Sequence, residues 1–210
     1  MNRKYKNNDY SACNKIINSI WDFDNRFKPQ NLSELFKKIY VLSSLSASNF
    51  TIIIEEDEDI KGFLFGNCGN KNLFKNKYSG ISGKISILIN LLFLKGVSLK
   101  KKLHYIHSIG IHEQNRSAIE PSRENEVNLF AVKPDCQGKG YGKILLNEFI
   151  NYCKTAKIKR ITLETDRECN YKFYEHLGFK LKGEFYSPLQ KEYTGVSGDS
   201  FVFELKLENK

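Results

Sequence analysis

The glycine-rich loop between Lys133 and Leu146 constrains the fold of this chain more than any other feature. It has the sequence KPDCQGKGYGKILL, in which three glycines alternate at Gly138, Gly140 and Gly142. A strand-like segment, EVNLFAV, precedes the loop, and apolar residues at helical spacing follow it. This order predicts an α/β fold in which the loop joins the carboxyl end of a strand to the amino end of a helix.

The glycine spacing excludes two common nucleotide-binding loops. A Walker loop has four residues between its glycines and then Lys and Ser or Thr. Here three residues separate Gly138 from Gly142, and Ile144 follows Lys143. A dinucleotide fingerprint is G-x-G-x-x-G, whereas this loop is G-x-G-x-G. Neither a nucleoside triphosphate nor a dinucleotide is therefore predicted.

The same loop is suited to bind another anion. The first amides of a helix lack intrahelical partners, and the helix dipole adds positive potential there. Alternating glycines let a ligand approach the backbone. Lys139 and Lys143 add charge at the edge. We expect backbone amides to hold a pyrophosphate here; a tight turn without a ligand is the alternative.

The other segments predict further helices and strands on both sides of this unit. A mixed α/β sheet with a parallel pair at its centre follows from their order. The predicted elements are helices at 9–21, 31–45 and 142–156, a short helix ending before Gly178, and strands at 50–56, 60–68, 126–132, 159–165, 180–187 and 200–207.

Residues 69–125 are predicted to form a helical insertion within one domain spanning residues 1–210. Its apolar stretch, ISILINLLFL at 85–94, is too short to cross roughly 30 Å of hydrocarbon as a helix. We expect a helix packed on the domain; a helix at a membrane surface, helped by the basic segment that follows, is the alternative. The polar tract HEQNRSAIEPSREN, at 112–125, predicts a flexible surface loop.

Composition narrows the class of protein. The formal net charge of +9 suggests nucleic acid, but only six of the 33 basic residues are arginines, which base and phosphate contacts favour. No nucleic-acid partner is expected. Five cysteines, without a C-x-x-C pair or a signal peptide, indicate reduced thiols in a cytoplasm. The four histidines form no known metal spacing with them, so no metal is expected.

Two motifs resemble one family. Gln137 to Gly142 fits the Q/R-x-x-G-x-G/A motif of the GNAT family of N-acetyltransferases, and NYKFYEHLGF is similar to its second signature. The resemblance is specific from about Glu126 to Gly183. It implies the GNAT fold, a mixed central sheet of about six to seven strands flanked by helices, with the parallel pair splayed at the centre. It also implies acetyl-CoA as cosubstrate and an amine acceptor.

The resemblance assigns a role to each matched residue. Backbone groups of Phe130, Ala131 and Val132 would pair with the pantetheine arm, and Asn170 would hydrogen-bond its end. Tyr174 would protonate the leaving thiolate, because a pKa of about 10 keeps phenol protonated at neutral pH. The amides that would hold the pyrophosphate belong to Gln137, Gly138, Lys139, Gly140, Tyr141, Gly142 and Lys143.

The proton acceptor is left open by the sequence. Glu126 aligns with a glutamate found at that place in many family members, and a water chain could also serve. A covalent acyl-enzyme on Cys136 or Cys169 is disfavoured, because a lone cysteine without a positioned histidine base is usually inert. The rival carboxylates are Glu55, Glu56, Glu164 and Asp166.

The sequence thus predicts a cytoplasmic N-acetyltransferase that moves an acetyl group from acetyl-CoA to a primary amine by direct attack. The alternative is a catalytically weak acyl-CoA sensor that uses the same pocket. The identity of the amine stays open, because the segments that choose it, 15–50 and 69–125, match the family least. A homodimer is possible, and no membrane span is predicted.

Overall fold

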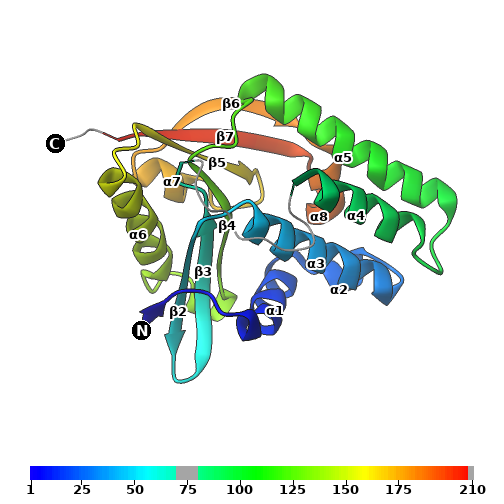
Figure 1. The fold of residues 1–210 in the computed structure, drawn as a ribbon, viewed down its shortest axis with the longest axis horizontal. Helices are drawn as coiled ribbons and strands as arrows, with labels where there is room; N and C mark the ends of the chain where they lie inside the picture. Colours follow the sequence, from blue (N-terminus) through cyan, green and yellow to red (C-terminus); the bar gives the residue numbers. More distant parts are fainter. Residues whose placement is uncertain (70–79, 208–210) are drawn as a thin grey trace.

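The computed structural model describes residues 1–69 and 80–207. One seven-stranded sheet runs through them in the order β1-β2-β3-β4-β5-β7-β6 (Figure 1). All neighbours are antiparallel except β4 and β5, which are parallel. The strands are β1 (Asn2–Arg3), β2 (Phe50–Glu56), β3 (Asp59–Gly66), β4 (Glu126–Val132), β5 (Arg160–Asp166), β6 (Lys180–Tyr186) and β7 (Asp199–Lys206).

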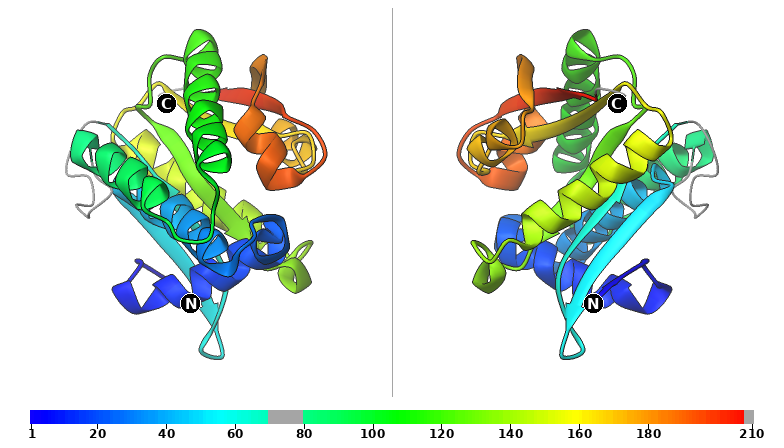
Figure 2. Two further views of the ribbon diagram at one scale, coloured as in Figure 1. Left: turned by 90° about the vertical axis from the view of Figure 1, so that its right-hand side faces the viewer. Right: turned by 90° about the vertical axis from the view of Figure 1, so that its left-hand side faces the viewer.

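Helices cover both faces of the sheet. Figure 2 shows α6 in front of the strands in one view and α3, α4 and α5 in front in the opposite view. The helices are α1 (Tyr10–Trp21), α2 (Phe23–Arg26), α3 (Gln30–Ser46), α4 (Gly80–Leu92), α5 (Leu99–Ile119), α6 (Tyr141–Thr155), α7 (Lys172–His176) and α8 (Pro188–Thr194), with short 3-10 turns at Asn7–Asp9 and Pro134–Cys136.

Each face of the sheet has its own apolar core. On the face of α1, α2 and α3, aromatic rings dominate: Phe27 and Phe36 stack with their ring centroids 4.5 Å apart. On the other face, α6 buries Leu145, Leu146 and Phe149 against the central strands. Helical spacing places these three side chains on one stripe, which is why the segment forms a helix packed on the sheet.

The elements around the glycine loop agree with the prediction. β4 spans the predicted residues, α6 begins one residue earlier than predicted, and α7 ends before Gly178, whose φ of 89° is left-handed. The mixed sheet with its parallel pair is confirmed. α8, between the last two strands, was not predicted.

The prediction for the polar tract at 112–125 is wrong. Residues up to Ile119 are the last turns of α5, and the short connection to β4 is held by hydrogen bonds. Glu120 is buried and accepts hydrogen bonds from Arg160 (2.6 Å) and Lys182. The side chain of Asn125 accepts one from the Gly69 amide (2.7 Å). A tract of charged residues is therefore ordered by partners that are distant in the sequence.

The apolar stretch at 85–94 forms most of α4, which packs on the domain as expected, but only by one side. Leu91 lies in the core, whereas several apolar neighbours face solvent. No helix among residues 1–69 and 80–207 is long and apolar enough to cross a membrane. All five cysteines are free thiols.

Candidate active site

The centre of the sheet opens between β4 and β5. The two strands pair only where Glu126 lies opposite Thr162 and Val127 lies opposite Leu163. Beyond these pairs, β4 continues along β3 as far as Val132, and β5 continues along β7. The parallel strands therefore separate after their first residues, and one edge of each is left facing the gap.

Backbone groups of β4 point into this gap. The Lys133 amide donates to the Lys61 carbonyl (2.8 Å), so the backbone groups of Lys133 and Ala131 face β3. The backbone N–H and C=O groups of consecutive strand residues point to opposite sides, so those of Phe130 and Val132 point toward β5. Within the described residues no strand pairs with them on that side.

The glycine loop lies at the carboxyl end of β4. Gly138 and Gly140 have left-handed φ angles of 77° and 87°, and among residues 1–69 and 80–207 a Cβ atom added to either would meet no atom within 4 Å beyond its sequence neighbours. The first intrahelical bond of α6 runs from the Ile144 amide to the Gly140 carbonyl (3.1 Å). The amides of residues 141–143 precede this bond, so they have no acceptor within the helix. The loop is an open cradle of backbone donors.

Side chains fix this loop to the sheet. The Tyr141 hydroxyl donates to a Glu56 carboxylate oxygen (2.5 Å), and the side-chain amide of Gln137 donates to the Val132 carbonyl (3.4 Å). Glu55 pairs with Arg3 (2.5 Å). Both carboxylates at the end of β2, those of Glu55 and Glu56, therefore already have hydrogen-bonding partners.

Aromatic rings bring α7 against β4 and α6. The Phe130 and Phe173 rings stack with centroids 6.0 Å apart, and the Tyr174 ring lies 6.3 Å from Phe130. A Cβ atom on Gly142 would lie 3.2 Å from the Phe130 ring and 3.3 Å from the Phe173 ring. Glycine at this position lets the three elements meet. The two motifs of the sequence thus share one site beside the gap.

Tyr174 lies in the middle of this aromatic group. Burial raises the pKa of its phenol above the usual value, and the nearby Cys169 and Asp166 raise it further. The hydroxyl therefore stays protonated at neutral pH and can donate a proton. Asn170 is exposed just before α7, and its carbonyl accepts the Phe173 amide (3.1 Å).

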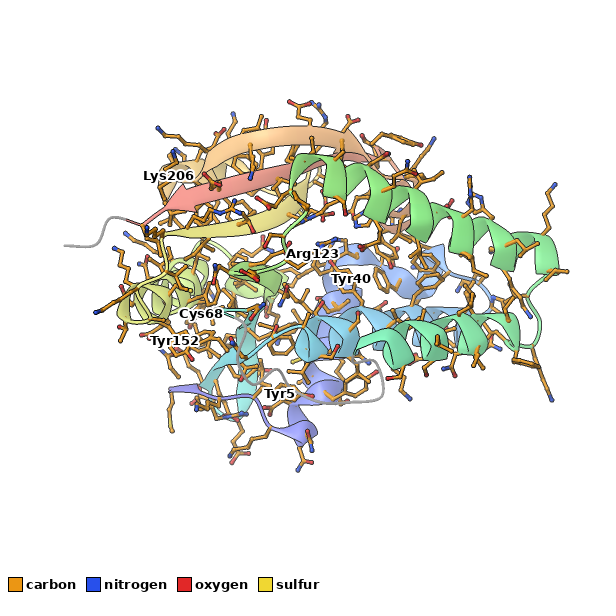
Figure 3. The ribbon with its side chains drawn as sticks, turned by 45° about the horizontal axis from the view of Figure 1, so that its top comes forward. Tyr5, Tyr40, Cys68, Arg123, Tyr152 and Lys206 are labelled. Carbon is orange, nitrogen blue, oxygen red and sulfur yellow. The ribbon has the colours of Figure 1, made fainter. Side chains whose placement is uncertain are left out.

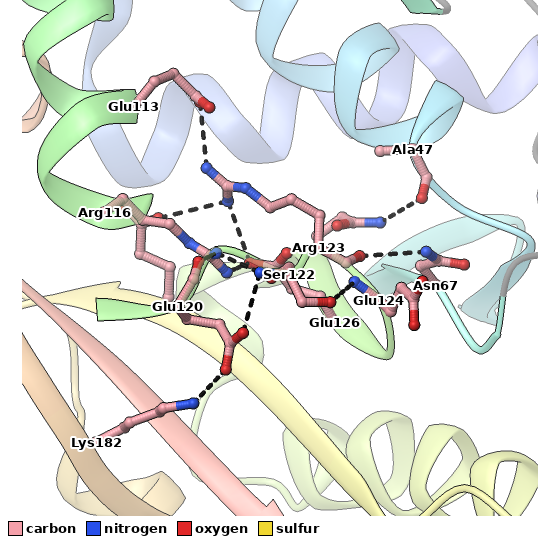
Figure 4. A network of polar contacts seen from close by, with 12 residues as sticks. Ala47, Asn67, Glu113, Arg116, Glu120, Ser122, Arg123, Glu124, Glu126 and Lys182 are labelled. Atoms are coloured by element: carbon pink, nitrogen blue, oxygen red, sulfur yellow. Dashed lines mark hydrogen bonds and ion pairs between the residues drawn. The ribbon is translucent and has the colours of Figure 1, made fainter. Parts of the chain in front are cut away.

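Charged side chains gather at the opposite end of β4 (Figure 4). Glu126 is buried and accepts hydrogen bonds from Arg116 (2.7 Å) and Arg123 (3.2 Å). Arg116 is fully buried, and its guanidinium also donates to the carbonyls of Glu120 and Ser122, the latter at 3.0 Å. One arginine therefore ties the end of α5 and the following connection to the central strand.

The cluster continues onto β5. Glu164 lies 3.8 Å from Arg123 and 3.9 Å from Arg116, and it keeps part of its surface exposed. Desolvation raises the pKa of Glu164 to about 7, while the two arginines pull it down. Burial also raises the pKa of Glu126, and the same arginines oppose this. Two carboxylates thus share two guanidinium groups at the start of the gap.

His112 of α5 lies beside Glu164, with 3.6 Å between its Nε2 and a carboxylate oxygen. Burial lowers the pKa of His112 to about 4, so the imidazole is neutral at neutral pH and this approach is not an ion pair. Its Nδ1 lies 2.9 Å from the Ser187 hydroxyl. Burial raises the pKa of the Tyr40 phenol on α3, and the nearby charges of Asp166 and Glu164 add to the shift. Figure 3 shows Arg123 and Tyr40 in the middle of the molecule and Tyr152 on α6.

The remaining candidates have structural partners. Asp166 is buried and accepts hydrogen bonds from Gln190 (2.5 Å) and from the amides of Glu168 and Cys169. Burial raises the pKa of Cys169 to about 12, with Asp166 adding to the shift, and burial also raises the pKa of Cys136. Both thiols are protonated at neutral pH and are poor nucleophiles. No group of three His, Cys, Asp or Glu in the described chain is arranged to hold a metal ion.

Sequence reasoning missed His112, Arg116, Arg123 and Tyr40. The two arginines fell in the tract that was predicted to be a flexible loop. The sequence did hold a signal for the two arginines. Arginine is rare in this chain, and it suits buried ion pairs better than lysine does. Both ends of β4 thus border the same gap: backbone donors and Tyr174 lie along it, and the paired carboxylates lie where it begins.

Comparison with known proteins identifies the family. The profile of the acetyltransferase (GNAT) family matches residues 14–179. Because this match covers most of the chain, the chain belongs to the GNAT family.

Individual relatives are more distant. The N-alpha-acetyltransferase RimI of Mycobacterium tuberculosis is 29% identical over 90 residues, which cover 43% of this chain and 53% of that protein. An uncharacterized N-acetyltransferase, ycf52, of Gracilaria tenuistipitata is 40% identical over 63 residues, 28% of this chain and 34% of its own length. These two matches thus span from a third to a half of each relative. The ycf52 protein of Pyropia yezoensis is 25% identical over 73% of this chain and 98% of its own length.

Solved structures share the fold over nearly the whole chain. The ribosomal-protein-S18-alanine N-acetyltransferase of Escherichia coli has a TM-score of 0.51 at 14% identity, covering 99% of this chain and 94% of its own. Ard1 of Thermoplasma volcanium has a TM-score of 0.53 at 13% identity, covering 99% and 97%. At such low sequence identities, the structural similarity establishes the fold alone.

Proposed function

We propose that this chain transfers the acetyl group of acetyl-CoA to a primary amine by direct attack within a ternary complex. The observation that carries the proposal is the gap between β4 and β5, with a glycine loop at its far end and Tyr174 beside it. This one site offers backbone partners for an extended ligand, amides for a pyrophosphate and a proton donor. Family membership and relatives named as N-acetyltransferases support the proposal.

The chain has groups that fit each part of acetyl-CoA. The amides of residues 137–143, which include the unpaired first amides of α6, would hold the pyrophosphate, with Lys139 and Lys143 at the edge. The backbone groups of Phe130 and Val132 would pair with the pantetheine arm as a neighbouring strand does, with Ala131 between them. Asn170, exposed before α7, would bind the end of that arm. The thioester supplies an acyl carbon open to nucleophilic attack.

Proton transfer is proposed to start at the carboxylate pair. Glu164 keeps part of its surface exposed, and a pKa of about 7 lets it accept a proton near neutral pH. Glu126 is buried between Arg116 and Arg123, and it would act with Glu164 as one pair that takes up the proton of the incoming ammonium. The neutral amine then attacks the thioester carbonyl.

The other proton is proposed to come from Tyr174. Its raised pKa keeps the phenol protonated until the thiolate leaves. A backbone amide of β4 that faces the gap, from Phe130 or Val132, would stabilise the oxyanion of the tetrahedral intermediate. The new C–N bond forms in this intermediate, and the nitrogen then gives up its second proton to the carboxylate pair, which has passed the first to solvent through Glu164. As the C–S bond breaks, Tyr174 donates its proton to the leaving sulfur and is reprotonated from solvent before the next turnover.

An acceptor screen with thiol detection tests the proposal. The panel holds polyamines, aminoglycosides, amino acids and peptides with a free amino terminus, the last because two of the similar proteins are named for amino-terminal or alanine acetylation. The expected result is release of coenzyme A above the hydrolysis background with at least one amine. Binding of acetyl-CoA without such release from any amine would instead support the sensor alternative.

A further inference from the structure

α4 presents an apolar stripe to solvent. Ile85, Leu88, Ile89 and Leu92 recur at the spacing of one helix face, and their exposed fractions are 52%, 40%, 49% and 37%. Leu91, on another side of the same helix, is buried in the core. A helix of a globular protein normally turns its apolar stripe inward. α4 is therefore apolar both toward the core and away from it.

The exposed apolar surface continues past the end of α4. Phe93 follows the helix with 80% of its surface exposed, and Leu99 and Leu103 are exposed in the first turns of α5. Figure 1 shows α4 and α5 as an antiparallel hairpin whose turn lies at the outer end of the molecule, far from α6 and the glycine loop. We call Ile85, Leu88, Ile89, Leu92 and Phe93 the outer face of α4.

Positive charge borders the outer face of α4. Between Asp59 and Glu113 the sequence contains lysines but no acidic residue. Lys95 is exposed in the turn between α4 and α5, and Lys100 is exposed in the first turn of α5. Lys28 lies beside this turn, because Lys101 donates a hydrogen bond to its carbonyl (3.2 Å). The apolar face is thus flanked by cations at its exposed end.

We propose that the outer face of α4 docks onto the surface of an anionic lipid bilayer. An apolar face bordered by lysines is the pattern of helices that lie in the membrane interface, where side chains enter the acyl boundary and lysines attract anionic headgroups. With 13 residues, α4 is shorter than the roughly 20 that a membrane-spanning helix needs. A second copy of this chain would bring like charges together. Nucleic acid could stack a base on Phe93, but it offers no surface that would cover the aliphatic side chains of the helix.

Vesicle flotation of the full chain tests the proposal. The vesicles contain equal parts of phosphatidylglycerol and phosphatidylcholine, or phosphatidylcholine alone. We expect the chain to float with the anionic vesicles only. Ile85→Gln with Ile89→Gln removes apolar surface that is already exposed and should abolish flotation without unfolding the chain. The matched control is Leu181→Gln on β6, where 47% of the side chain is exposed, and it should float like the parent.

A second pair of variants tests the role of charge. Lys95→Gln with Lys100→Gln should weaken binding to anionic vesicles about fivefold for each lysine removed. Lys154→Gln with Lys180→Gln removes the same charge from exposed positions elsewhere and should have a much smaller effect.

Three results would overturn the proposal: no binding to anionic vesicles, equal binding to neutral ones, or a parent dimer that the Ile85 and Ile89 changes convert to a monomer without any flotation. Circular dichroism of every variant verifies the fold. The proposal does not depend on the acetyltransferase activity, so failure of the acceptor screen leaves it unaffected.

Discussion

The two ends of β4 are built in different ways. At its carboxyl end, the glycine loop and the first turn of α6 follow directly in the sequence, and open backbone makes the site. At its amino end, Glu126 is covered by Arg116, ten residues earlier in the chain, and lies near Glu164, from the neighbouring strand. The first end is a local motif with little packing, whereas the second is a buried set of charges held by tertiary contacts.

This difference predicts which property each end controls. A change in an open loop should alter ligand affinity and leave most of the stability intact. A change in a buried charged cluster should alter stability, because it leaves an uncompensated charge in the interior. Tyr174 lies against Phe130 beside the gap and Glu164 lies where the gap begins, and changes at either residue should act on turnover.

The largest effect is expected for Tyr174→Phe. Loss of a general acid lowers turnover by about 10²–10⁴-fold, while the affinity for acetyl-CoA stays close to normal because the ring packing against Phe130 is kept. Steady-state kinetics and calorimetry measure the two quantities. Tyr171→Phe, in the same segment, is the control and should leave turnover unchanged. Retained turnover in Tyr174→Phe would show that another group protonates the thiolate.

Arg116→Ala is expected to lower the free energy of unfolding by about 3–5 kcal/mol, because Glu126 would keep its burial and lose its closest partner. Chemical denaturation measures the change. Arg167→Ala, which breaks the exposed pair with Asp199, is the control and should cost less than about 1 kcal/mol. Similar losses in both variants would contradict the contrast between a buried cluster and the surface.

The proposed base predicts a pH dependence. With an aromatic amine that is neutral throughout, the only proton that the carboxylate pair takes up is the one that nitrogen loses on attack. Here kcat/KM should fall about tenfold per pH unit below about 7, as Glu164 becomes protonated and can no longer accept it. Glu164→Gln should lower the rate about 10²-fold and flatten the profile, whereas Glu168→Gln should keep it. An unchanged pH profile in Glu164→Gln would show that another group accepts the proton of the amine.

The same shift has a consequence for stability. Because the folded chain binds the Glu164 proton more tightly than the unfolded chain does, this group stabilises the fold at low pH, and its contribution is lost as pH rises from 4.5 to about 7. Denaturation of the parent and of Glu164→Gln across this range compares the two slopes. The parent should lose more stability with rising pH than the variant.

The smallest of these effects is expected at the loop. Gly140→Val places a β-branched residue at a φ of 87°, and it should weaken acetyl-CoA binding by at least about tenfold. Apart from its neighbours in sequence, no described residue lies within 4 Å of the added Cβ, so crowding of the pyrophosphate, together with backbone strain, is the expected cause. Gly96→Val, at a φ of 75° in the α4–α5 turn, is the control for strain alone. Unchanged affinity by calorimetry would refute the loop assignment.

The sequence predicted the fold well where local signals agree. Apolar spacing predicted α6, the apolar runs at 50–56 and 60–68 predicted β2 and β3, and Gly178 marked the end of α7. It failed at 112–125, because the partners that order this tract, such as Arg160 and Lys182, lie on strands far along the chain. Charged residues resemble a solvated loop in sequence whether or not such partners exist.

By itself, the sequence predicted the half of the proposed site that would hold the acyl donor. Glycine positions, an adjacent helix and a second motif are consecutive features, and their chemistry depends on backbone that neighbours in the chain supply. Only the tertiary structure decided the other half. Burial shifts the pKa of Glu164, and Arg116 and Arg123 pair with Glu126 because α5 crosses the start of β4, where low dielectric strengthens every charge interaction. The tertiary packing also leaves the second apolar face of α4 exposed to solvent, and no local sequence pattern indicated this.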